Sequence, residues 1–102
     1  MTIEEFKNTL REHNPPEGLS VFLLSLWHEA KGNWDKAHSL VDSLSGEDAA
    51  HVHAYLHRKE GDLANADYWY RRAGKVRPEM DLAKEWESLV STLSFTQSRK
   101  EK

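Results

Sequence analysis

The sequence predicts an all-α domain of about six antiparallel helices, arranged as two similar helical hairpins flanked by capping helices. Residues 21–45 align with residues 50–74 at a constant offset of 29 positions. Matched pairs at this offset are His28 with His57, Gly32 with Gly61, and Ala37 with Ala66. Apolar residues also recur at helical spacing between Gly and Pro breaks. One hairpin cannot bury its own apolar face, so consecutive hairpins are expected to stack.

The first two predicted helices lie at residues 3–13 and 17–31. Thr2 followed by Glu5 is a capping box that begins the first of them. The run Asn14-Pro15-Pro16 ends it, because a residue that precedes proline avoids the helical region. The second is apolar around nearly its whole circumference, so burial on several sides is expected.

Four further helices follow between clear start and stop signals. Asn33 caps the third helix, and acidic first-turn and basic last-turn residues mark a fourth at 47–60. Asp62 begins the fifth and Pro78 ends it. The sixth is predicted at 79–93.

Composition limits the class of protein. The 102 residues are 38% hydrophobic and include ten aromatic residues, which indicates a folded chain: a single domain over 1–93 and a flexible polar tail over 94–102. A net charge of −3 argues against a nucleic-acid partner, and no apolar run is long enough for a membrane span. The chain contains no cysteine, and we expect a cytoplasmic protein.

The second hairpin carries a recognisable phrase, the run Gly61-Asp62-Leu63-Ala64-Asn65-Ala66 followed by Tyr70, Ala73 and Pro78. This phrase resembles the second half of a tetratricopeptide repeat, although the period of 29 is shorter than the usual ~34 residues. The resemblance implies a protein-interaction module whose partner is a protein, a peptide or a second copy of the chain. The segment from His53 to Arg72 also resembles a small uncharacterised bacterial family, which implies no activity.

The resemblance further implies a groove lined by the second and fourth helices. Its predicted residues are Leu19, Phe22, Leu26, Glu29, His51, Tyr55 and Arg58, with Asp48 on the same face of the fourth helix. An open apolar half would be an interaction patch. We expect the first helix to fold back over the second through Ile3, Phe6 and Leu10, and the sixth to cap the fifth.

Six histidines raise an alternative from another class, a small metal-binding or metal-dependent helical protein. His53 and His57 lie four residues apart on one predicted helix, and His28 is the repeat equivalent of His57. Three imidazoles suit zinc or another first-row metal. Partly buried histidines that only pack in the core explain the same pattern, so we predict no cofactor. The sequence holds no catalytic constellation, and we do not expect an enzyme.

Overall fold

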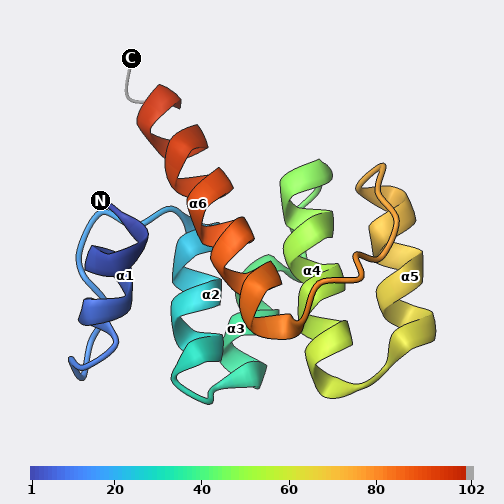
Figure 1. Ribbon diagram of the computed structural model, residues 1–102, viewed down its shortest axis with the longest axis horizontal. Coiled ribbons are helices and arrows are strands. Elements are labelled where there is room, and N and C mark those ends of the chain that lie inside the picture. Colours follow the sequence, from blue (N-terminus) through green and yellow to red (C-terminus); the bar gives the residue numbers. More distant parts are fainter. Residues whose placement is uncertain (101–102) are drawn as a thin grey trace.

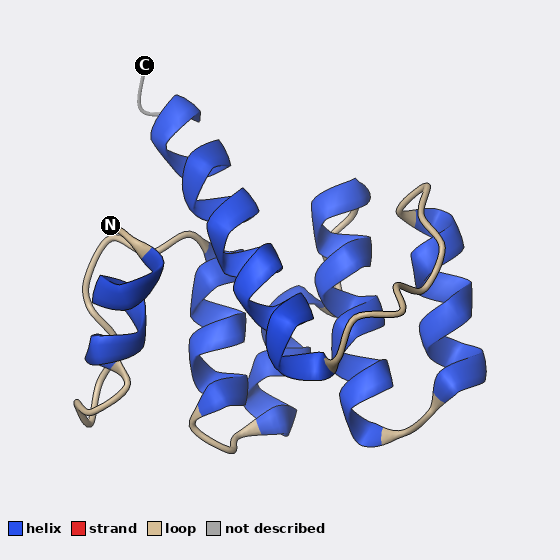
Figure 2. Cartoon of the chain, in the orientation of Figure 1, coloured by secondary structure: helices blue, strands red, loops and turns tan. Residues whose placement is uncertain are grey.

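The computed structural model describes the backbone of residues 1–100 and the side chains of residues 1–94, and the described residues are all helix and loop (Figures 1 and 2). The all-α prediction is confirmed. The helices are α1 (Ile3–Thr9), α2 (Val21–Ala30), α3 (Trp34–Val41), α4 (Glu47–Glu60), α5 (Leu63–Arg72) and α6 (Leu82–Lys100).

The middle of the chain forms two antiparallel hairpins, α2 with α3 and α4 with α5. Each hairpin turns at a glycine in the left-handed region, Gly32 at φ 88° and Gly61 at φ 92°. An L-residue is strained there, and glycine is not. The next residue caps the following helix: Asn33 accepts a hydrogen bond from the Lys36 amide, and Asp62 accepts one from the Asn65 amide. The predicted turn residues therefore act as expected.

Small residues allow the helices of each hairpin to approach closely. Ala37 and Ala66, the pair expected at close crossings, are both fully buried. Opposite Ala37, the buried hydroxyl of Ser25 donates a hydrogen bond to the Ala37 carbonyl at 2.8 Å. A larger side chain at either alanine would push the paired helices apart.

Helix α6 runs diagonally across the layer of helices formed by the two hairpins and packs on α2 and α4 (Figure 1). The Trp86 indole donates to the Leu26 carbonyl of α2 at 3.1 Å, and its ring lies 5.7 Å from that of Phe6 on α1. The main core contains apolar residues of α1, α2, α3, α4 and α6. The expectation for the last helix needs correction, because α6 covers the faces of α2 and α4 rather than capping α5. The backbone of α1 lies nearest to α6, but α1 also contacts α2 as expected, since the Trp27 indole donates a hydrogen bond to the Thr9 hydroxyl at 3.0 Å.

A buried carboxylate fixes α6 in this position. Glu85 is only 2% exposed and accepts hydrogen bonds from Arg58 at 2.7 Å and from the Tyr70 hydroxyl at 2.6 Å. Its other close partner is His51, at 3.4 Å. Burial by itself raises a carboxyl pKa, but hydrogen bonds from His51, Tyr70 and Arg58 outweigh it and hold the pKa of Glu85 below its ordinary value.

Several helix boundaries differ from the prediction. The bounds of α4 agree, whereas α2 begins only at Val21, because Gly18 adopts φ 88° and the Ser20 side chain caps the helix by accepting from the Leu23 amide. At the other end, α6 begins three residues later than expected and continues past Leu93 to Lys100. Residues 101–102 of the predicted tail lie outside the described residues. Within the described chain, no helix combines the length and the apolar character that a bilayer crossing needs.

Candidate functional site

The predicted groove is largely occupied by the chain itself. Leu26 and Tyr55 are buried beneath α6, and Leu19 and Phe22 are half-buried against the core. Arg58 donates a hydrogen bond to Glu85, and its second guanidinium nitrogen donates to the Met80 carbonyl at 2.6 Å. Helix α6 therefore packs on the faces of α2 and α4 that were predicted to line the groove.

Part of the groove remains hollow at the edge of α6. A cavity of about 560 Å³ lies between α1, α2, α4 and α6, and two of the predicted groove residues, Glu29 and Tyr55, line it. The buried Glu29 carboxylate accepts a hydrogen bond from the Tyr55 hydroxyl at 3.0 Å. Lys59 approaches the other Glu29 oxygen at 3.5 Å. Apolar walls come from Leu10, Leu82 and Trp86.

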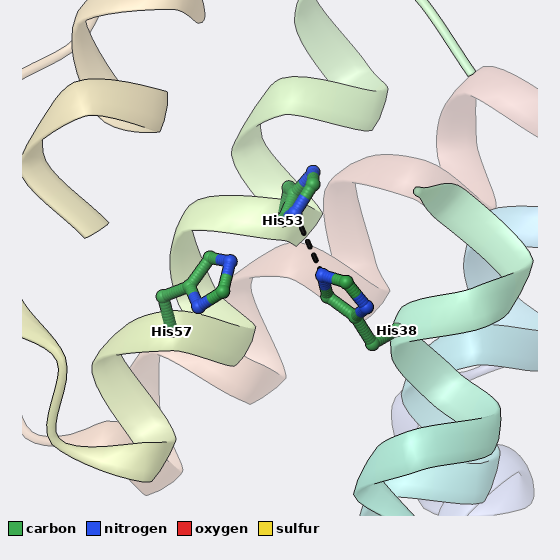
Figure 3. Close-up of side chains that lie close together, drawn as sticks. All are labelled: His38, His53 and His57. Carbon is green, nitrogen blue, oxygen red and sulfur yellow. Dashed lines mark hydrogen bonds between the residues drawn. The ribbon is translucent and has the colours of Figure 1, made fainter. Parts of the chain in front are cut away.

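A second site lies on the other side of α4, where three imidazoles converge between α3 and α4 (Figure 3). His38 comes from α3, and His53 and His57 come from successive turns of α4. One nitrogen of each ring lies within 4.8 Å of one nitrogen of the other two. The closest pair, His38 Nε2 and His53 Nε2, is 2.9 Å apart, so one ring donates a hydrogen bond and the other accepts it.

Aromatic side chains hold the rings of this three-histidine cluster in place. The Trp34 indole stacks on His38 with centroids 4.8 Å apart, and the Trp69 indole stacks on His53 at 3.9 Å. The Trp34 nitrogen donates to the Leu56 carbonyl of α4 at 2.7 Å, which fixes this indole across the α3–α4 interface. Rings held by packing and by hydrogen bonds lose little freedom when they bind a ligand.

Carboxylates border the cluster on two sides. Glu60 pairs with His57 Nδ1 at 2.8 Å, which leaves Nε2 of that ring for the cluster. Asp42 lies at the C-terminal end of α3, with Oδ1 at 3.8 Å from His38 Nε2 and 4.0 Å from His53 Nε2. A carboxylate on the outer nitrogen of a ligating histidine fixes the tautomer and orients the ring.

The surroundings keep at least one of the rings neutral. Burial, followed by the neighbouring His38 and His57 rings, lowers the pKa of His53 to about 4. An imidazole must be neutral to bind a metal, so His53 is in its ligand form at neutral pH.

The structure brings together two of the three histidines that the sequence singled out, and it replaces the third. His28 lies on α2 with its ring edge-on to Trp27 at 5.2 Å, outside the cluster, and burial lowers its pKa. His38 takes the place expected for His28. The sequence did contain a signal for His38. In stacked hairpins the second helix of one hairpin lies beside the first helix of the next, and His38 follows the buried Ala37 on that second helix.

Comparisons of the chain with protein-family models, with curated proteins and with solved structures found no match.

Proposed function

We propose that this protein binds a first-row transition-metal ion, with zinc the best suited, through His38, His53 and His57. The observation that carries the proposal is the convergence of three imidazole nitrogens, from two helices, within 4.8 Å of one another. A donor set of imidazoles without thiolates favours zinc, copper or nickel, whereas magnesium and calcium prefer oxygen ligands.

The distances support direct coordination. A tetrahedral zinc ion with bonds of about 2.0–2.1 Å places its ligand atoms roughly 3.4 Å apart. The nitrogens of His38 and His53 are 2.9 Å apart, close to that value, and a nitrogen of His57 lies within 4.8 Å of both. Small rotations of the rings would therefore admit the ion without movement of α3 or α4.

Calorimetric titration of zinc into protein that carries no polyhistidine tag tests the proposal. We expect about one ion per chain, as in a mononuclear site. His57→Ala should weaken binding by more than about 100-fold, since even outer-shell substitutions typically cost 10–100-fold. His28→Ala is the matched control, because that residue is a partly exposed helix histidine outside the cluster. Absence of binding, or equal losses in both variants, would refute the proposal.

A peptide or protein partner is the second candidate function, and the cavity beside α6 is the observation that favours it. The resemblance to tetratricopeptide repeats implies such a partner, and the cavity of about 560 Å³ retains Glu29 and Tyr55 from the predicted groove. An apolar groove between helices is a common site for an amphipathic peptide helix.

A pull-down with a cavity-filling variant tests the second candidate. Ala83 lines the cavity and is exposed, so Ala83→Trp can place an indole over the opening without disturbing the core. We expect this variant to lose partners that the wild type and His57→Ala both retain. Identical partner lists for Ala83→Trp and the wild type would exclude the cavity as the binding surface.

A further inference from the structure

On its solvent-exposed side, the three-histidine cluster is bordered by one carboxylate that is positioned to complete a metal site. Asp42 is four residues beyond His38, and its Oδ1 lies 3.8 Å from His38 Nε2 and 4.0 Å from His53 Nε2. We infer that Asp42 is the fourth ligand, which makes this a closed site of three imidazoles and one carboxylate. The inference rests on the metal-binding function proposed above.

The arrangement of the four side chains on the two helices supports this assignment. His38 and Asp42 are four residues apart on α3 and its C-cap, and His53 and His57 are four residues apart on α4. Residues at this spacing share one face of a helix. Each helix therefore presents a pair of ligands to the same point, and the bound ion would link α3 to α4.

The charge balance supports it as well. His53 and His57 are 3% and 7% exposed, so an ion held by neutral imidazoles alone would carry its full double charge into a largely buried site. An uncompensated charge away from water is costly. A carboxylate in the coordination shell halves that charge, and Asp42 provides it from the solvent side, since its side chain is 61% exposed.

The neighbouring carboxylates already have other roles. Glu60 holds His57 at Nδ1, on the outer side of that ring. Asp62 caps α5 by accepting from the Asn65 amide at 3.2 Å. Among the described residues, the ion pairs of Asp42 are with His38 and His53 only. Its Oδ1 is about 0.4–0.6 Å beyond the ligand spacing of roughly 3.4 Å from two of the three rings, and coordination requires it to approach the third ring, His57, as well.

Cobalt(II) is a suitable probe, because its visible absorption is strong in four-coordinate sites and weak in six-coordinate ones. We would compare the wild type with Asp42→Asn and Asp42→Ala, and with Asp35→Asn as a control from the exposed first turn of the same helix. The wild type and Asp35→Asn should give the same strong spectrum, unchanged by azide. Both Asp42 variants should weaken zinc binding by at least roughly tenfold. In Asp42→Ala, azide should occupy the vacated position and shift the spectrum.

The outcomes separate this inference from the proposed function. If the wild type binds neither zinc nor cobalt, the metal-binding function fails, and the inference fails with it. If it binds both while the Asp42 variants have unchanged affinities and spectra, only the role of Asp42 is refuted. A wild-type spectrum that azide alters would also refute that role, because it would show an open fourth position. Circular dichroism of the metal-free variants checks that each is folded.

Discussion

Removal of the Glu85 carboxylate should destabilise the fold more than any other single loss of charge on α6 described here. In Glu85→Ala, the Arg58 guanidinium and the Tyr70 hydroxyl lose hydrogen bonds of 2.7 and 2.6 Å. Arg58 then remains as a charge whose side chain is only 15% exposed. Hydrogen bonds to charged groups contribute about 1.5–3 kcal/mol each, and breaking a buried ion pair costs about 3–5 kcal/mol. We therefore expect a loss of about 3–5 kcal/mol in the free energy of unfolding.

Urea denaturation at neutral pH measures this loss directly. Glu87→Ala is the matched control, because Glu87 lies on the same helix and pairs with Lys7, but its side chain is 45% exposed. A surface pair of this kind contributes about 0–1 kcal/mol. In thermal melts, Glu85→Ala should lower Tm by at least about 12 °C, since each kcal/mol corresponds to about 4 °C or more in a domain of this size. A loss below about 1 kcal/mol, or one equal to that of Glu87→Ala, would show that Glu85 does not anchor α6.

Three further predictions concern the hairpins and the histidines. Ala66→Leu should cost about 1–3 kcal/mol by overpacking, whereas Ala64→Leu, at an exposed position of the same helix, should leave the urea midpoint nearly unchanged. Stability should fall as the pH is lowered from 6.5 toward 4, because the unfolded His53 takes up a proton at its ordinary pKa of 6.5 and the folded one only near about 4. Between these two pH values the free energy of unfolding should fall by about 3 kcal/mol. In a pH series of urea melts, stability should therefore depend less steeply on pH in His53→Gln than in the wild type. Zinc at about 100 times its Kd should stabilise the wild type by about 2.7 kcal/mol, and melts of His38→Ala should show no such gain.

Local signals in the sequence identified the four helices of the hairpins but not all of their ends, since α5 ends at Arg72 although Pro78 was expected to end it. The acidic start and the basic end of α4 predicted its bounds, and Asn33 and Asp62 identified the caps of α3 and α5. The start of α2 was wrong by four residues, although Ser20 was available as a cap. These signals act within one turn of a helix, so they are readable without knowledge of tertiary contacts.

Contacts between distant helices could not be read in the same way. Apolar spacing predicted the sixth helix, but not that its Trp86 packs on α2 rather than on α5. The position of Glu85 beside Trp86 was a usable sign, because a carboxylate on an inward-facing stripe requires a buried cationic or hydroxyl partner. The sequence predicted two of the three histidines of the cluster, because only those two are related within one helix. His53 and His57 share a helix face, whereas the contribution of His38 depends on how α3 is rotated against α4.

The contact between α1 and α6 has a consequence for how the domain unfolds. In an open stack of hairpins, stability is approximately a sum of terms between neighbours, and the ends can fray independently. Here the ion pair of Lys7 with Glu87 and the packing of Phe6 on Trp86 join the first helix to the last; α1 and α6 lie beside one another in Figure 1. Neither hairpin can lose its cover without opening the shared core, so hydrogen exchange from α2 and α4 should report a single global opening rather than a gradient along the stack.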